Sequence, residues 1–463
     1  MSRLAAALAV ALALAPWVRA DDRPDEAAMF SAAETSTTTT GAPAAAPAEP
    51  VAATPPVHEV APENPLAIGG QLYWREAVTA HAHQTPRGWS NTAPLLADAW
   101  LDGRPNPRLR AMIVGRLAFD PTVTPSATSF FAPSLDGGPT AALDQAWIKF
   151  DVAHRAFITA GRQHVKWGAS RFWNPNDLLH GARRDALAQF DARVGQTMLK
   201  VHVPWERYGW NFYGIQLLES LDHADTVGRT GGAARAEVVL GPAELGLDGL
   251  VQRGFRPRAG ADLSSALGPF DVYGEGTVQY RTDRPLWRKA AVQPPVGSAL
   301  ESYTPEKVVG SVSGGLNWAF KFTDKDVMTV GAEYFYNPAG YTDKAIYPWL
   351  MFNGDFAPFY VARDYAAAYV FFSVPGTNGN HTITLSNLAN LSDHTAIARL
   401  DWTATVVTHM RFEAYAAGSY GAPGGEFRFG LDTSPTAING LPVPAFHLPA
   451  PVAEAGLALR VSF

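Results

Sequence analysis

The sequence repeatedly alternates apolar and polar residues with a period of two, over segments of about ten residues. In "RLRAMIVGRLAF" (108–119) the apolar side chains fill the odd positions, whereas Arg108, Arg110 and Arg116 stand at even positions. The same period recurs in "FDVYGEGTVQYR" (270–281) and "VVGSVSGGLNWAFKF" (308–322). A period of two puts alternate side chains on opposite faces of a β-strand, and ten residues is about the length at which a tilted strand crosses a bilayer.

Short and long links alternate between these segments. The short links include "AHR" (153–155), "PWER" (204–207) and "TDKD" (323–326). The long links cover roughly 80–91, 120–141, 166–192, 220–232, 282–306, 338–357 and 420–452. This alternation is typical of a transmembrane β-barrel with short periplasmic turns and long outer loops. We therefore predict an all-β, antiparallel transmembrane barrel of sixteen to eighteen strands, in which the weak segment 259–265 is one strand.

The N-terminus indicates export. Arg3, the apolar stretch "LAAALAVALALA" and "VRA" before Asp21 are typical of a signal peptide over residues 1–20, cleaved after Ala20; the alternative is a short membrane anchor. The Ala-, Pro- and Thr-rich stretch that follows predicts a disordered tail over 21–66, which leaves 67–463 for the barrel. The chain has no cysteine and a net charge of −6, which argues against a disulfide framework and a nucleic-acid partner.

The C-terminal segment "AEAGLALRVSF" alternates and ends on Phe463. A long apolar strand at a chain end would be an aggregation hazard in a soluble protein, whereas in a closed barrel it pairs with the first strand. The segment resembles the last strand of outer-membrane barrels, and the resemblance implies that Phe463 is an assembly signal read by the barrel-assembly machinery.

Two further stretches carry a resemblance to a family. "GRQHVKWGASRFWNPNDLL" (161–179) and "NLANLSDHTAIARLDW" (387–402) are similar to segments of Gram-negative outer-membrane porin-type β-barrel families, many of whose members are uncharacterised. The resemblance implies a Gram-negative outer-membrane location, contact with membrane lipid and lipopolysaccharide, and small polar solutes as ligands. Porins often form trimers, so a homotrimer stays open.

The resemblance also gives a role to residues 166–192. They form the third long link, and in porins the third outer loop commonly folds into the lumen and narrows it. We expect Asp177 to begin a short helix whose Leu178 and Leu179 pack on the wall. The charged residues expected to line or narrow the pore are, on this loop, Arg171, Asp177, Arg183, Arg184, Asp185 and Asp191, and, on nearby strands, Arg162, Lys149, Arg116 and Arg110. Opposed charges across a lumen select solutes by charge and size.

Three tryptophans lie in or near this loop: Trp167 and Trp173 within it, and Trp147 upstream of it. They are candidates for membrane-interface aromatics or structural packing, with sugar stacking as the alternative.

The sequence shows no catalytic motif, and we expect no enzyme activity, cofactor or metal. His81 and His83 have no third ligand beside them. We therefore predict an outer-membrane channel that passes small polar solutes by diffusion. The alternatives are a substrate-specific transporter, a plugged structural barrel and, last, an outer-membrane enzyme.

Overall fold

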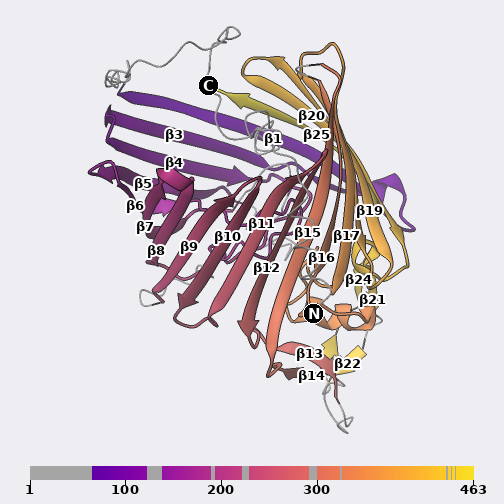
Figure 1. The fold of residues 1–463 in the computed structure, drawn as a ribbon. Coiled ribbons are helices and arrows are strands. Elements are labelled where there is room, and N and C mark those ends of the chain that lie inside the picture. Colours follow the sequence, from indigo (N-terminus) through magenta and orange to yellow (C-terminus); the bar gives the residue numbers. More distant parts are fainter. Residues whose placement is uncertain are drawn as a thin grey trace.

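A computed structural model describes residues 65–122, 138–188, 193–221, 229–290, 300–323, 326–433, 436–438, 441–443 and 445–463 (Figure 1). The predicted signal peptide (1–20) and almost all of the predicted tail (21–66) lie outside this range, as does Asp191. The first strand begins at Leu66, one residue before the predicted start of the barrel.

Eighteen long strands of the described residues form one antiparallel barrel. They are β1 (Leu66–His81), β3 (Leu95–Asn106), β4 (Leu109–Phe119), β5 (Thr140–Val152), β6 (Ala156–Gln163), β7 (Gln196–Trp205), β8 (Trp210–Leu217), β9 (Gly231–Leu240), β10 (Ala243–Gln252), β11 (Arg258–Leu267), β12 (Phe270–Tyr280), β15 (Val308–Lys321), β16 (Val327–Tyr336), β17 (Asp364–Ser373), β18 (His381–Asn390), β19 (Thr395–Val407), β20 (Met410–Gly421) and β25 (Pro451–Ser462). The predicted all-β class and strand number are confirmed, and β11 covers the weak segment 259–265.

The two ends of the chain close the barrel. β25 pairs with β20 on one side and with β1 on the other, in a register from Gln71↔Ser462 onward. Phe463 extends this ladder, because its N–H donates to Gly70 O at 3.0 Å and its C=O accepts from Gly70 N at 2.9 Å. Figure 1 shows β1 and β25 side by side, although nearly the whole sequence separates them. The expected pairing of the terminal strand with the first is thus present.

Mostly short turns occupy one end of the barrel, which we call the turn end, and all of the long links occupy the other, the link end. Nine links join successive strands at the link end, and three of them matter for function. Link 3 is residues 164–195, link 7 is 337–363 and link 9 is 422–450.

The links carry the remaining small elements. These are β2 (Ser90–Thr92), β13 (Leu286–Lys289), β14 (Leu300–Tyr303), β21 (Leu431–Thr433), β22 (Thr436–Ile438), β23 (Leu441–Val443), β24 (Phe446–Leu448), α3 (Tyr347–Phe352) and the 3-10 turns η2 (Pro86–Gly88), η4 (Lys344–Ile346) and η5 (Glu426–Arg428), while the 3-10 turn η3 (Glu206–Tyr208) lies at the turn end. Among the described residues, no helix has the length and apolarity to cross a membrane.

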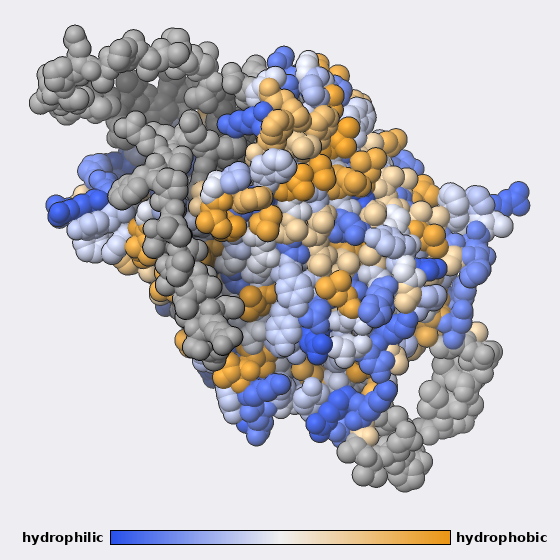
Figure 2. Space-filling view, turned by 45° about the vertical axis from the view of Figure 1, so that its right-hand side comes forward, coloured by the Kyte–Doolittle hydropathy of each residue, from blue (hydrophilic) through white to orange (hydrophobic). Residues whose placement is uncertain are grey.

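The two faces of the wall differ as the period of two predicts. Large apolar side chains such as Leu72, Ile113 and Leu316 are exposed on the outer face, and Figure 2 shows apolar residues over this wall. The intervening positions carry buried polar side chains, among them Asp98 and Glu333. An apolar outer surface and a polar interior are the arrangement of a barrel that faces lipid.

Candidate permeation pathway

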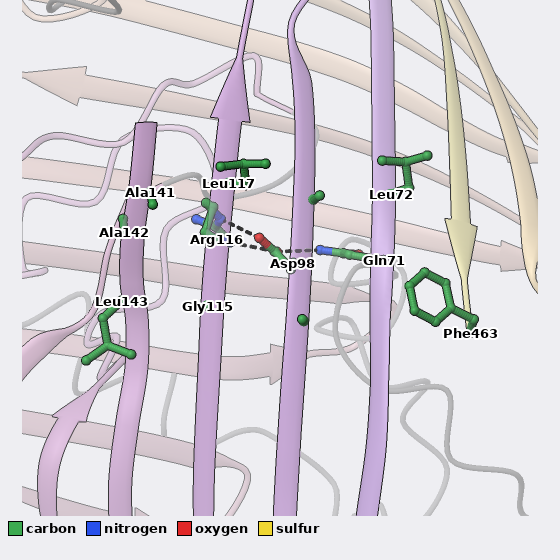
Figure 3. Close-up of a pocket in the computed structure, with 12 residues that line it drawn as sticks. Gln71, Leu72, Asp98, Gly115, Arg116, Leu117, Ala141, Ala142, Leu143 and Phe463 are labelled. Carbon is green, nitrogen blue, oxygen red and sulfur yellow. Dashed lines mark hydrogen bonds and ion pairs between the residues drawn. The ribbon is translucent and has the colours of Figure 1, made fainter. Parts of the chain in front are cut away.

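A network of charges lines the inner face of β3, β4 and β5. Arg116 donates to both carboxylate oxygens of Asp98, at 2.8 and 3.0 Å, and lies 3.6 Å from Asp144. Gln71 donates to Asp98 at 2.9 Å, and Figure 3 shows Gln71 and Arg116 reaching this carboxylate from opposite sides. Asp144 also accepts from His164 at 2.9 Å. Each charged side chain of this network therefore has a partner on the wall.

A second group of charges lies on the same strands nearer the turn end. Arg110 holds Asp102 through two contacts of 2.8 and 3.0 Å, and Arg104 holds the same carboxylate at 2.7 Å. The guanidinium of Arg110 lies 5.5 Å from the ring of Trp147. Lys149 is exposed on this face, with its Nζ 5.3 Å from the ring of Phe157. Arg110, Arg116 and Lys149 thus lie on the inner face.

Link 3 is held against the inner wall by two carboxylates. Glu333 of β16 accepts the backbone N–H of Arg171 at 2.8 Å, of Phe172 at 3.1 Å and of Trp173 at 2.8 Å. Its side chain is 4 % exposed, and it also accepts hydroxyl protons from β12 and β15. Three consecutive amides that converge on one carboxylate form an anion-binding nest, built here to hold the chain rather than a ligand.

Glu275 of β12 provides the other anchor. It accepts the backbone N–H groups of Ala169 at 2.6 Å, Ser170 at 2.8 Å and Asn176 at 3.1 Å. The amide of Asn176 then donates to Asp248 of β10 and Asp262 of β11, at 2.7 and 2.9 Å. Link 3 leaves the wall at β6 and is bound to strands from β10 to β16, so its path runs through the interior of the barrel.

Two apolar cores fix link 3 further. Leu178 and Leu179, 2 % and 0 % exposed, pack on the inner face of β7 to β10 together with Trp167. Trp173 is 0 % exposed and stacks on Phe335 at 5.7 Å in a second core. That core joins link 3 to links 7 and 9 and to the wall at β16 to β18. The packing interpretation of Trp167 and Trp173 therefore agrees with their positions, and the membrane-interface interpretation does not.

The predicted helix after Asp177 is wrong. Residues 178–188 form turns and bends, and no residue among them is helical. The carboxylate of Asp177 does not cap a helix, because it contacts His180 Nδ1 at 2.8 Å and Arg193 Nη1 at 2.9 Å. Leu178 and Leu179 are both buried in one core, and these tertiary contacts override the weak helical signal.

The other predicted charges of link 3 lie along its path. Arg171 is stacked on the ring of Tyr369, 3.5 Å from its centroid. Arg183 is exposed, 4.7 Å from the ring of Tyr360, and Asp185 is also exposed. Arg184 donates to the carbonyl of Arg171 at 3.3 Å. Arg183 and Asp185 are thus the predicted charges of this link with most access to water.

Arg162 is placed differently from the expectation. It lies in register with Ala146 and Thr197, on the face where Ile148 and Leu199 are exposed, and this is the outer face. Its guanidinium donates to Glu219 at 2.8 Å. The residue therefore belongs to the outer rim at the link end. The sequence "AGRQ" does not show which alternate residues of this strand face the interior, because the strand is short.

Sequence reasoning missed the polar cluster beneath links 7 and 9. Glu426 is buried and accepts from Tyr365 at 2.7 Å and Asn390 at 2.8 Å, and its own N–H donates to Asp393. Burial raises the pKa of Glu426 to about 8, with the negative charge of Asp393 adding to the effect. No local motif marks this cluster, since its members come from strand ends and links far apart in sequence.

Comparison with known proteins agrees with this architecture. No protein-family model matches the chain, and no curated protein matches it by sequence. Among solved structures, Acinetobacter baumannii OccAB4 is similar, with a TM-score of 0.50 and 7 % identity over 86 % of this chain and 98 % of that one. Pseudomonas aeruginosa OccK9 (OpdG) gives a TM-score of 0.50 and 10 % identity over 86 % and 97 %. The chain has the fold of outer-membrane porins.

Within the described ranges, no group of three or more His, Asp or Glu side chains could hold a metal ion. His81 contacts Ser90 at 2.9 Å. The described interior side chains carry charges and hydrogen-bonding groups, among them Asp98, Arg116 and Gln71.

Proposed function

We propose that the protein is an outer-membrane channel that passes small polar solutes by diffusion, and that link 3 forms its constriction. One observation carries the proposal: link 3 crosses the interior of an eighteen-strand barrel and is held there by Glu275 and Glu333. A barrel this wide encloses an aqueous lumen unless something fills it, and a loop bound at both walls narrows that lumen.

The proposed path is eccentric. The apolar core of links 3, 7 and 9 fills the interior beside β16 to β18 with side chains such as Trp173 and Tyr347, both 0 % exposed. Charged side chains line the wall from β3 to β7. Polar solutes therefore pass along that charged wall, where paired arginines and carboxylates replace part of their hydration.

The cellular setting follows from the same proposal. The turn end faces the periplasm and the link end the outside, and the outer face contacts lipid and lipopolysaccharide. Residues 1–20 direct export, residues 21–66 form a tail, and Phe463 is read by the barrel-assembly machinery. Arg171, Asp177, Arg183, Arg184, Asp185 and Asp191 belong to the constriction. A homotrimer is one assembly state to test by cross-linking.

Planar bilayers test the channel. Purified protein should give discrete conductance steps in KCl. If the protein inserts into the bilayer as a folded barrel but gives no conductance steps, the result would instead support a plugged structural barrel. Solute-specific saturation of the current would support a selective transporter, and turnover of a lipid or ester substrate would support the enzyme alternative.

A further inference from the structure

Two lysines stand in one row of the inner face near the turn end. Lys149 of β5 is in register with Thr159 of β6, and Thr159 is in register with Lys200 of β7. The residues that flank the row, Ile148 and Leu199, are exposed on the outer face. Alternation along the strands therefore directs both lysines and Thr159 to the interior.

Neither lysine has a carboxylate partner among the described residues. The carboxylates of neighbouring rows are already engaged: Asp102 with Arg110, Asp151 with Arg108 at 2.9 Å, and Glu237 with Arg235 at 2.9 Å. This differs from the Asp98 and Arg116 network, where each charge is matched. The row thus carries two positive charges that the protein does not neutralise.

The row has defined borders. Toward the link end lie Met198 and Leu217, which belong to the apolar core that covers Leu178 and Leu179 of link 3. Toward the turn end lies an aromatic row in which Phe157 stacks on His202 at 5.8 Å and His202 on Tyr213 at 4.6 Å. A solute that has passed link 3 along this wall meets the two lysines next.

The spacing suits one small ligand. β5 and β7 are separated by one strand, which puts the two lysine backbones about 10 Å apart. Each flexible side chain ends in an ammonium with three donors, so both can reach one anion between them. Two uncompensated positive charges favour a doubly negative ligand over a singly negative one.

We propose that Lys149 and Lys200, which stand on either side of the buried Thr159, form a binding site for a small dianionic oxyanion, of the class of sulfate or phosphate. The site rests on the proposed channel function, because its ligand arrives through the lumen. It deepens that function by naming a solute class and the place where the solute pauses after the constriction.

Sulfate in planar bilayers tests the site, since it stays doubly charged over the working pH range. Sulfate added to a KCl solution of fixed ionic strength should reduce the chloride current in a saturable way, and acetate should do so far less. In K149Q/K200Q the sulfate concentration for half-reduction should rise at least about tenfold, since two charge-assisted contacts are lost. K149R/K200R should retain the effect.

K321Q is the matched control. Lys321 lies at the turn end of β15, exposed and on the same face as Asn317, so K321Q removes one inward positive charge on another wall. K321Q should respond to sulfate as the unmodified protein does.

Conductance steps without any sulfate effect, or an equal effect in K149Q/K200Q, would overturn the lysine site and leave the channel standing. A loss of the effect in K321Q as well would overturn it in favour of general charge screening. Absence of steps in every protein, the unmodified one included, would overturn the proposed function itself.

Discussion

Replacing Glu333 by Gln removes the negative charge of one of the two anchors of link 3 while keeping its shape. The carboxylate accepts three consecutive amides of the link, from Arg171 to Trp173. A glutamine offers one acceptor oxygen and turns an NH2 group toward the remaining N–H donors. Hydrogen bonds to a charged group contribute about 1.5–3 kcal/mol each, against about 1 kcal/mol for neutral ones, so the substitution costs roughly 3 kcal/mol across three bonds.

This cost acts on the attachment of link 3 rather than on the barrel. Each 1.4 kcal/mol is a factor of ten, so about 3 kcal/mol raises the population of detached link about 100-fold. Glu275 holds the link separately, and E333Q should therefore show brief excursions to a larger conductance. E275Q/E333Q should show a larger conductance most of the time, because both carboxylates are then lost. Single-channel recording in KCl measures both effects.

E413Q is the matched control for this experiment. Glu413 is also a buried carboxylate of the inner wall, 4 % exposed, but it pairs with Arg460 at 3.4 Å and contacts no residue of link 3 in the interactions described. E413Q should leave the amplitude distribution unchanged. If E275Q/E333Q keeps the conductance and gating of the unmodified protein while remaining inserted, the idea that link 3 narrows the lumen is refuted.

Three further changes test other parts of the structure. R183A/R184A should shift the reversal potential in a KCl gradient toward cation selectivity, because two positive charges leave the link; an unchanged potential would remove their assigned role. The pKa of Glu426 is raised from 4.5 to about 8, so the packed state binds a proton more tightly than the state in which link 9 is detached. The attachment of link 9 should therefore weaken as pH rises from about 4.5 to 8 and should not change further above pH 8. The rate of proteolysis of link 9 should rise over the same pH range, and E426Q should remove this pH dependence. W173A should destabilise the core of links 3, 7 and 9 by about 3–5 kcal/mol, since it empties a fully buried site; heat-induced mobility shift in gels measures this loss, and an unchanged transition would contradict the packing role.

The barrel could be predicted because its signals are local. Alternation along 108–119 or 308–322 needs only neighbours in sequence, and the parity of links follows from strand order. The face on which a side chain near a strand end lies is harder to predict, as Arg162 shows, because a shift of one residue along the strand moves the side chain to the other face. The helix after Asp177 failed for another reason: Leu178 and Leu179 obtain their burial from strands β7 to β10, which the local sequence does not specify.

The anchors of link 3 show why the interior resists prediction. Asp98 and Glu333 are both inward carboxylates on long strands, and in sequence they look alike. Asp98 neutralises an arginine, whereas Glu333 holds three backbone amides that carry no sequence signal at all. An inward carboxylate can therefore either balance a charge on the wall or position a loop in the lumen. Which of the two roles it has depends on the group that donates hydrogen bonds to it. Removing the first kind should change ion selectivity at constant lumen width. Removing the second should change the width itself, and the two outcomes are separable by comparing reversal potential with conductance in D98N and E275Q/E333Q.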